Sequence, residues 1–261
     1  MQVTSDTLFH FTNSISNLKN ILNQRFKITY CKETFSLDNT SHSYYFPMLS
    51  FSDIPLSLTK DHIYKYGNFG IGMSKEWGIR NQLNPVIYIE QNSIIAKDIQ
   101  NTLNMLKIIL GESIISNNTE KSITNIQELT WANLNVIRHI KNYAGDLIRG
   151  PKTHKDYRFY DEREWRYVPK WNKDKVSFKN FISTEEDYLN FRNNQKTKPF
   201  IENIKIDFTC DDIKYLIVKS NKDIPNLIKE IREIDGLIKT ANDIEILTTK
   251  IITVDQLKSD F

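Results

Sequence analysis

The sequence is poor in the residues that mark specialised small folds. Its 261 residues include only two cysteines, Cys31 and Cys210, together with 8 glycines and 7 prolines. The cysteines form no CxxC pair, which argues against a zinc ribbon, a thioredoxin-like site and a disulfide-stapled secreted scaffold. The low glycine and proline content, beside 39% hydrophobic and 26% charged residues, is typical of an ordinary folded protein. A chain of this length buries enough surface to fold without staples.

Long apolar runs are also missing. No stretch approaches the roughly 18 apolar residues that a membrane span requires, and the start MQVTSDTLFHF has neither a basic nor an apolar leader segment. We therefore expect a cytoplasmic protein without a membrane contact. The 35 basic and 32 acidic residues leave a formal net charge of +3, which is too mild to indicate nucleic-acid binding by itself.

Several catalytic motifs are absent as well. The sequence contains no GxxxxGK[ST] loop and no GxSxG elbow, which argues against a P-loop ATPase and an α/β-hydrolase. The histidines form no HExxH or HxH pair, so we expect no metal site; they are His10, His42, His62, His139 and His154.

Hydrophobic spacing predicts strands and helices interleaved in one α+β domain over residues 1–261. Strands are expected at 8–11, 48–52, 67–73, 86–89, 165–168, 215–218 and 244–247, and helices at 15–22, 56–66, 75–81, 184–193 and 224–235. Residues 31–46 and 149–161 lack such spacing and are interpreted as polar connections. Helical spacing from about 93 to 147 predicts a helical insertion with a structural or partner-binding role, separate from any catalytic cleft.

The first candidate site residues are His10 and Thr12. In a strand they share one face, while Phe9 and Phe11 share the other. Two polar groups at a strand end could bind the hydroxyls of a ribose. The alternative is that both simply face solvent.

The second candidate group is Glu162, Glu164 and Arg166, which strand alternation places on one side. Two carboxylates at the start of a strand can divide their work, one stabilising a developing cation and the other acting as a base toward an acceptor. The alternative is a solvated charge run held in surface salt bridges.

Small hydroxylated residues and aromatic residues form a third group. Ser50 and Ser52 alternate along a predicted strand, and Tyr66 follows in an aromatic segment. Such residues could line a nucleotide pocket, although aromatic residues more often belong to the core. Separately, the basic residues around 149–166 are interleaved with aromatic ones and could contact a nucleic-acid strand, with a solvated loop as the alternative.

The ordered motifs FHFT, LKNIL, LSFSDIPLS, YGNFGIGMSKEWG, NPVIYIE and DEREWRYVP resemble the AbiGi family of abortive phage-resistance antitoxins. The resemblance covers about residues 8–90 and 157–170. It implies a role in phage defence, in a toxin–antitoxin arrangement with a cognate protein partner.

The order of an N-terminal HxT strand, an NLKNIL helix, an SFS strand and a late ExE also resembles ADP-ribosyltransferases, including the DarT-like DNA-modifying toxins. This resemblance implies an ADP-ribosyltransferase-like core, with a mixed or antiparallel sheet and a helical insertion, that uses NAD as co-substrate. Carried over to this sequence, His10 would hold a ribose of NAD and Glu164 would be the catalytic glutamate. Ser50 and Ser52 would form the strand wall, Tyr66 would stack on nicotinamide, and Glu162 would activate the acceptor.

Two functional hypotheses follow. The first is a phage-defence protein with an NAD-binding cleft that ADP-ribosylates a nucleic acid or a protein. The second is a non-catalytic antitoxin that binds a cognate toxin or operator DNA. The first hypothesis requires the polar faces of the first strand and of the DEREWR strand to converge on one pocket. We expect His10 and Glu164 to lie on neighbouring strands, with their side chains in a cleft lined by Ser50 or Ser52. The sequence leaves open the catalytic competence, the acceptor, the partner and the oligomeric state.

Overall fold

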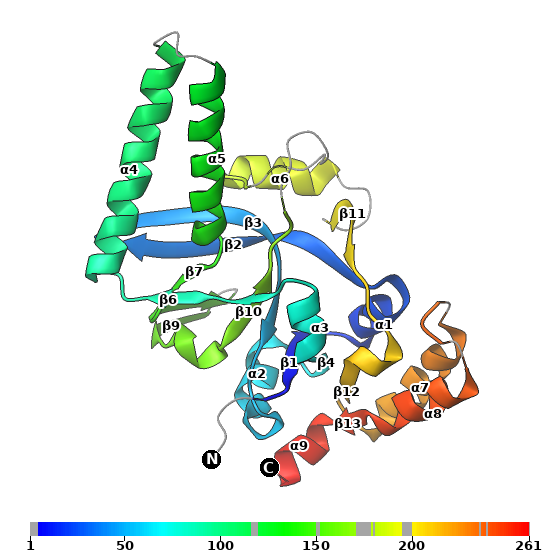
Figure 1. Ribbon diagram of the computed structural model, residues 1–261. Coiled ribbons are helices and arrows are strands. Elements are labelled where there is room, and N and C mark those ends of the chain that lie inside the picture. Colours follow the sequence, from blue (N-terminus) through cyan, green and yellow to red (C-terminus); the bar gives the residue numbers. More distant parts are fainter. Residues whose placement is uncertain are drawn as a thin grey trace.

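The chain forms a mixed α+β structure around one large sheet (Figure 1). The computed structural model describes residues 5–115, 120–149, 152–170, 179, 181–194, 200–234, 236–238 and 240–260. Over these residues the main sheet follows the order β11 (Phe200–Ile206), β2 (Phe26–Leu37), β3 (Thr40–Ser52), β1 (Thr7–Thr12), β4 (Phe69–Ser74), β12 (Ile213–Val218) and β13 (Ile251–Thr253). In addition, β10 (Glu164–Tyr167) pairs with β3, and β5 (Asn84–Pro85) pairs with β10.

Most strand pairs in this sheet are antiparallel, and the β12–β13 pair is parallel. Two smaller sheets accompany it. One joins β6 (Ile87–Ile89) and β7 (Ile140–Asn142) in parallel, and the other joins β8 (Gly145–Arg149) and β9 (Lys152–Tyr157) antiparallel. The α+β class expected from the sequence is confirmed.

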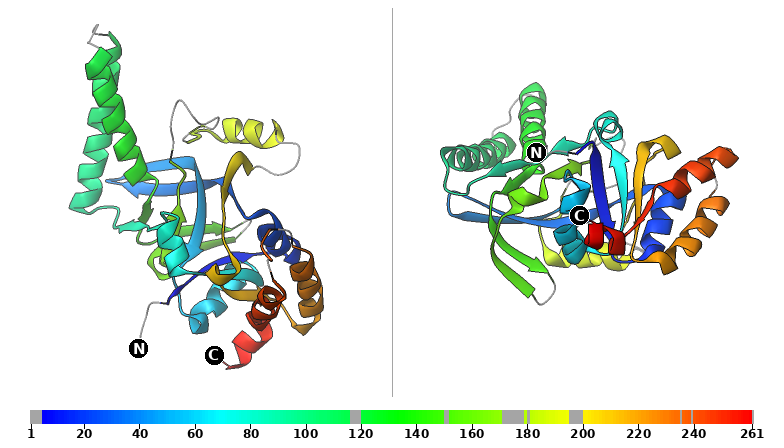
Figure 2. Two further views of the ribbon diagram at one scale, coloured as in Figure 1. Left: turned by 45° about the vertical axis from the view of Figure 1, so that its right-hand side comes forward. Right: turned by 90° about the horizontal axis from the view of Figure 1, so that it is seen from below.

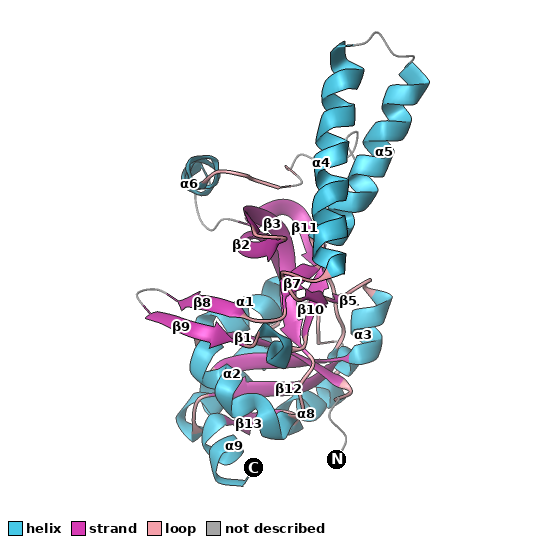
Figure 3. Cartoon of the chain, turned by 90° about the vertical axis from the view of Figure 1, so that its left-hand side faces the viewer, coloured by secondary structure: helices cyan, strands magenta, loops and turns pink. Residues whose placement is uncertain are grey.

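The helices are distributed around the sheet. Those described are α1 (Ile15–Gln24), α2 (Thr59–Tyr66), α3 (Lys75–Arg80), α4 (Ile94–Ile115), α5 (Glu120–Ile137), α6 (Glu185–Asn194), α7 (Ile224–Glu233), α8 (Ala241–Thr249) and α9 (Val254–Asp260). Helix α1 lies beside α7 (Figure 2), where Lys19 pairs with Glu230 at 2.8 Å. In contrast, α4 and α5 form a hairpin that projects away from the sheet (Figure 3). None of the described helices is long and apolar enough to cross a membrane.

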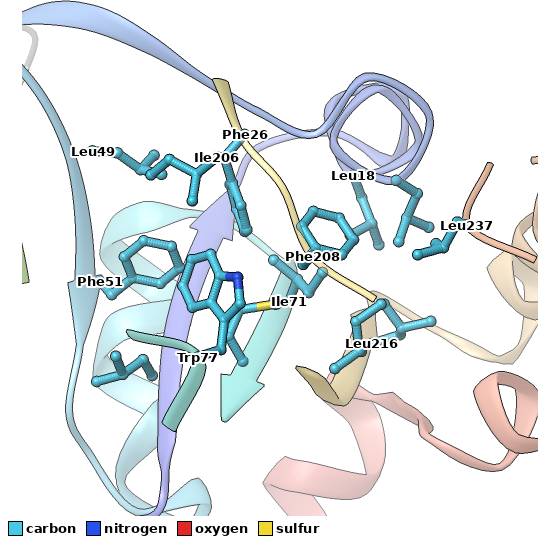
Figure 4. Close-up of a cluster of buried hydrophobic side chains, with 14 of the residues drawn as sticks. Leu18, Phe26, Leu49, Phe51, Ile71, Trp77, Ile206, Phe208, Leu216 and Leu237 are labelled. Atoms are coloured by element: carbon cyan, nitrogen blue, oxygen red, sulfur yellow. The ribbon is translucent and has the colours of Figure 1, made fainter. Parts of the chain in front are cut away.

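The main core lies around Trp77 of α3 (Figure 4). Its indole is completely buried between the rings of Phe26 and Phe51, with centroids 5.4 and 5.3 Å away, and its Nε1 donates to the Asp207 carbonyl at 2.9 Å. Truncation of such a side chain typically costs about 3–5 kcal/mol. Because neighbouring strand residues point to opposite faces, anchoring Phe51 in this core leaves Ser50 and Ser52 on the other face of β3.

The segment 31–46 was expected to be a polar connection, and this expectation is wrong. It belongs to a long hairpin of β2 and β3, joined by the two-residue turn Asp38–Asn39. Both turn residues have positive φ, 45° and 62°, as a type I′ hairpin turn requires. Asp and Asn tolerate this conformation, so the Asp38–Asn39 pair is the feature of the sequence that could have predicted the hairpin. The polar stretch 149–161 likewise contains β9 and the 3₁₀ turn Phe159–Glu162.

The strand expected at 244–247 is a helix instead. Residues 244–247 lie within α8, whose N-terminus is a capping box: the Thr240 hydroxyl accepts from the Asp243 amide at 3.2 Å, and the Asp243 carboxylate accepts from the Thr240 amide at 2.8 Å. These two bonds satisfy amides that a helix end leaves unpaired. The capping residues Thr240 and Asp243 favour a helix, and this local effect outweighs the alternation of Ile and Glu at 244–247 that indicated a strand.

The helical insertion is shorter than expected. Helices α4 and α5 account for residues 94–137, but 140–142 and 145–149 are the strands β7 and β8. The distinction is important because β7 brings a charged residue into the candidate site described below. In the described residues, no group of three or more His, Cys, Asp or Glu side chains could hold a metal ion.

Candidate functional site

Three strands bring the predicted residues together. Strand β3 pairs on one side with β1, through the single register pair Phe9 and Ser52, and on the other side with β10, where Glu164 lies opposite Ser52. His10 and Glu164 are therefore on strands separated by β3, not on neighbouring strands as expected. Ser52, the last residue of β3, belongs to both pairings, which explains why one strand connects the two groups.

A cavity of about 1110 Å³ opens beside these strands. Its walls include residues of β1, β2, β3 and the segment that follows β7. Pockets for drug-sized ligands measure about 300–1,000 Å³, so the volume of this cavity lies just above the upper end of that range. Six of the seven predicted site residues line it: His10, Ser50, Ser52, Tyr66, Glu162 and Glu164.

Thr12 is the exception. It is not among the residues that line the cavity, and its hydroxyl accepts a hydrogen bond from Asn17 Nδ2 at 2.9 Å. Although Thr12 follows His10 by two residues, β1 ends at Thr12, and the threonine hydroxyl binds a side chain of the first turn of α1. The predicted pairing of His10 and Thr12 around one ribose is not what the geometry provides.

His10 bridges the point where β1 and β3 separate. Its Nδ1 lies 2.9 Å from the Ser50 carbonyl oxygen. Because a carbonyl only accepts, Nδ1 carries the proton and Nε2 is left as an acceptor in the neutral ring. Burial lowers the pKa of His10, against the smaller raising effect of the Ser50 carbonyl, so the ring is neutral at physiological pH.

The Glu164 carboxylate accepts from four donors. Ser50 Oγ and Arg166 Nε both lie 2.6 Å from Oε1, and Lys141 Nζ and Arg166 Nη2 lie 2.8 and 3.1 Å from Oε2. Its backbone amide donates to the Tyr88 hydroxyl at 2.8 Å. Burial alone would raise the pKa of Glu164, but the charges of Arg166 and Lys141 outweigh burial and hold that pKa well below its ordinary range. The side chain is a buried, ionised carboxylate.

Glu162 reaches the same place from a different element. It ends the 3₁₀ turn Phe159–Glu162, and Arg163 then adopts a left-handed conformation with φ 43° before β10 begins. The two glutamates therefore face one another across a turn, not through the strand alternation that the sequence indicated. Glu162 Oε1 accepts from the Tyr66 hydroxyl, and Oε2 accepts from Lys141 Nζ at 2.8 Å.

Tyr66 is held against the end of β1 by the glycine that follows it. Gly67 has φ 122°, and a Cβ added there would lie 2.2 Å from the Thr12 carbonyl oxygen. Only glycine fits this close approach of α2 to β1. The Tyr66 ring stacks on His62 with a centroid distance of 5.7 Å. The predicted stacking of Tyr66 on nicotinamide would use its other ring face.

Lys141 is the functional residue that the sequence interpretation missed. It lies in the middle of β7, between the buried Ile140 and Asn142, and its Nζ contacts both glutamates at 2.8 Å. The Phe159 ring centroid is 5.1 Å from Nζ. A lone lysine after a helical segment carries no recognisable motif, so no sequence signal pointed to it.

Arg166 fixes the opposite side of the network. It is fully buried, forks onto Glu164, donates to Glu33 at 2.7 Å and donates to the Arg138 carbonyl at 3.0 Å. Such bidentate geometry is stronger and more directional than a single contact. The linked carboxylates of Glu33, Glu162 and Glu164 exceed the two cations Lys141 and Arg166 by one negative charge. The site therefore suits a cationic centre.

Comparisons with known proteins identify the family. A family model described as "Putative abortive phage resistance protein AbiGi, antitoxin" matches residues 24–219. The chain is 31% identical over 241 residues to the abortive phage resistance protein AbiGi of Lactococcus lactis subsp. cremoris, covering 87% of this chain and 93% of that protein. No solved structure matches significantly. The matched range contains most of the candidate site, and the chain belongs to the AbiGi family of abortive phage resistance proteins.

Proposed function

We propose that this protein acts in the cytoplasm in phage defence through an ADP-ribosyltransferase-like cleft that binds NAD. The observation that carries the proposal is the double connection at Ser50. Its carbonyl accepts from His10 and its hydroxyl donates to Glu164, at the wall of a cavity of about 1110 Å³. The two groups are joined through this one residue, and the His10 ring also contacts the Phe26 and Phe51 rings. A neutral imidazole acceptor and an ionised carboxylate suit a ribose hydroxyl and a developing ribosyl cation.

The proposed reaction begins at the bond between nicotinamide and ribose. As the C–N bond breaks, its electron pair moves to the nicotinamide nitrogen and the positive charge passes to the ribose. Glu164 stabilises that charge, and His10 Nε2 accepts a hydrogen bond from a ribose hydroxyl. The acceptor's nucleophilic atom then bonds to ribose C1′ and gives its proton to Glu162.

The acceptor is proposed to be a nucleic acid or a protein. Basic side chains that could approach a phosphate backbone remain beside the site: Lys155 and Arg158 are exposed, although they pair with Asp146 and Asp161. Exposed ion pairs of this kind are weak and exchange readily. Arg166, which the sequence grouped with them, is completely buried and is not available to an acceptor.

Calorimetric titration with NAD tests this proposal directly. We expect binding by the natural protein, at least tenfold weaker binding by His10→Ala, and nicotinamide release that is lost in Glu164→Gln. Thr12→Val is the matched control, because Thr12 lies close to His10 in sequence but does not line the cavity. No heat of binding with the natural protein would reject the NAD-binding cleft.

A second candidate function is that of a non-catalytic antitoxin that binds a cognate toxin. The observation that favours it is the outer face of α4, where Met105 and Ile108 are 64% and 58% exposed, opposite the buried Ala96 and Leu106. Exposed apolar residues aligned on one helix face are typical of a protein-binding surface.

The two functions are separable in cells that produce the cognate toxin. If the antitoxin function is correct, the double variant Met105→Ser and Ile108→Ser loses protection while Glu164→Gln keeps it. If the transferase function is correct, the effects are reversed. Both side chains are already solvated in the free protein, so their replacement should change stability by no more than about 0.5 kcal/mol each.

A further inference from the structure

Lys141 occupies a position that recognises a positive charge. Its ammonium lies 2.8 Å from Glu162 Oε2 and 2.8 Å from Glu164 Oε2, and 5.1 Å from the centre of the Phe159 ring. Two carboxylates and an aromatic face together form the surroundings that proteins use for cationic ligands. All three groups line the cavity, and so does Lys141 itself.

The carboxylate of Glu164 has no acceptor site left while Lys141 is in place. A carboxylate offers about four lone-pair positions, and those of Glu164 are used by Ser50, by Lys141 and twice by Arg166. The negative charge of Glu164 is therefore already compensated by Lys141 and Arg166. A cationic substrate group can approach it only if one donor leaves.

Lys141 is the donor that can leave. Ser50 and Arg166 belong to β3 and β10, the strands that carry the site, and the Arg166 fork is completely buried. Lys141 instead reaches in from β7 with a flexible four-carbon stem and a single point charge, and its side chain keeps 15% exposure. Rotation of the stem withdraws the ammonium without moving the strands.

We propose that Lys141 is an internal competitor for the cationic nicotinamide ring, so that the free protein holds its own site closed and NAD binds only when the ammonium is displaced. This inference rests on the proposed function and concerns the regulation of the same cleft. Removal of the ammonium changes the net charge of the linked groups from one negative to two negative. The site then attracts the oxidised, positively charged nicotinamide more strongly than the reduced, uncharged one.

The protonation state of Lys141 also favours displacement of the ammonium by a ligand. Burial alone would lower the pKa of Lys141, but Glu164, Glu162 and Glu33 outweigh it and raise that pKa well above its ordinary value. The lysine is therefore an ammonium throughout the physiological range, and loss of a proton does not open the site. Displacement by a ligand does.

The test compares oxidised and reduced NAD as ligands of the natural protein and of Lys141→Ala. We expect Lys141→Ala to bind oxidised NAD roughly tenfold more tightly, because one competing charge is gone, with less than a threefold change for reduced NAD. Lys32→Ala is the matched control, since Lys32 lines the same cavity but pairs with the exposed Glu185. It should change neither affinity.

A second measurement does not depend on NAD. n-Propylammonium replaces the side-chain atoms that Lys141→Ala removes, so it should raise the melting temperature of that variant and leave the natural protein unchanged. Lys141→Met keeps most of the stem without the charge and serves if the alanine variant does not fold. It should show the same gain for oxidised NAD without a response to propylammonium.

The outcomes separate the two ideas. If neither protein binds NAD but propylammonium stabilises Lys141→Ala, the proposed NAD function is wrong and the self-occupied cation position stands. If the folded lysine variants bind oxidised NAD equally or more weakly than the natural protein, or if propylammonium has no effect, Lys141 is a structural support for the glutamates and the inference is overturned.

Discussion

The two sides of the cavity are built in different ways. On one side, β1, β3 and β10 are joined by backbone pairing, and the buried Arg166 locks Glu164 into position. On the other side, Lys141 lies on the three-residue strand β7, and only residues 138–139 separate β7 from the end of the projecting α4–α5 hairpin. The first side holds a carboxylate in a fixed geometry. The second can change state, since a lysine stem and a short strand are easier to displace than a shared sheet.

This difference suggests how the two candidate functions could coexist. The hairpin presents exposed apolar residues, and β7 directly continues from it into the cavity. A protein bound to the hairpin would therefore contact the element from which the chain passes, through residues 138–139, to Lys141. Disruption of the fixed side should have larger effects than changes on the Lys141 side, because its contacts are buried and shared by three strands.

The largest effect is expected on stability from Arg166→Met. This change leaves Glu164 and Glu33 without their buried partner, and breaking a buried ion pair from one side typically costs about 3–5 kcal/mol. Urea unfolding measures the loss. Lys155→Met, which breaks the exposed pair with Asp146, is the control and should leave the midpoint nearly unchanged. Equal midpoints for both variants would show that Arg166 does not anchor the fixed side.

The next effect is on catalysis. If the protein turns over NAD, Glu164→Gln should lower nicotinamide release by about 10²- to 10³-fold, the usual cost of losing one well-placed electrostatic contact. The variant also weakens the Arg166 pair, so its folding must be checked by circular dichroism before rates are compared. Glu185→Gln, at an exposed carboxylate, is the control. Equal rates for the natural protein and Glu164→Gln would leave the non-catalytic antitoxin as the better account.

Glu162→Gln should have a smaller and more selective effect. Its proposed role is to take a proton from the acceptor, so transfer should fall by up to about 10²-fold while hydrolysis of NAD falls less. The measurement is nicotinamide release with and without an acceptor. A loss of both activities in parallel would place Glu162 with Glu164 in stabilising the cation.

The fixed side of the cavity could largely be predicted from the sequence. Alternation of polar and apolar residues located His10, Ser50 and Glu164 on strands, and local signals such as the Ser74 cap, which accepts from the Trp77 amide at 3.1 Å, located helices. Such patterns depend on neighbours within a few residues. They could not show that β3 separates β1 from β10, because strand order is decided by contacts far apart in sequence.

The other side could not be predicted for the same reason. Lys141 acquires its role only because β7 pairs with β6 and its side chain reaches Glu164 of β10. The spacing of its own segment indicated the end of a helical insertion. Glu162 was placed correctly beside Glu164 but for an incorrect reason, since a left-handed Arg163 makes the turn. The sequence pattern therefore does not predict the position of a side chain that is set by a short turn or by a single tertiary contact.

The smallest effect concerns His62, which packs behind the fixed side. Its ring lies between Phe11 and Tyr66, and within the described residues neither ring nitrogen has a hydrogen-bond partner. Burial lowers the pKa of His62, although Glu162 acts in the opposite direction. The folded protein therefore resists protonation of this ring, whereas the unfolded chain takes up a proton near pH 6.5.

The sign of the pH dependence follows from linkage. Below about pH 6.5 the unfolded state binds more protons than the folded state, so the free energy of unfolding falls as the pH is lowered. His62→Phe removes this contribution while keeping a ring of similar size, and should be within about 1 kcal/mol of the natural protein at pH 7.5. At pH 5 the variant should be the more stable of the two. His10 also has a lowered pKa, so part of the pH dependence remains.

Urea unfolding at the two pH values measures the difference. Phe11→Leu is the matched control, because it alters the same aromatic cluster without removing a titrating group, and it should lower stability equally at both pH values. If His62→Phe also shifts stability equally at both, the folded and unfolded states bind the same number of protons at His62, and burial does not lower the pKa of this ring. Water or a polar group would then reach the ring between Phe11 and Tyr66, and the packing behind Tyr66 would be as open to change as the Lys141 side.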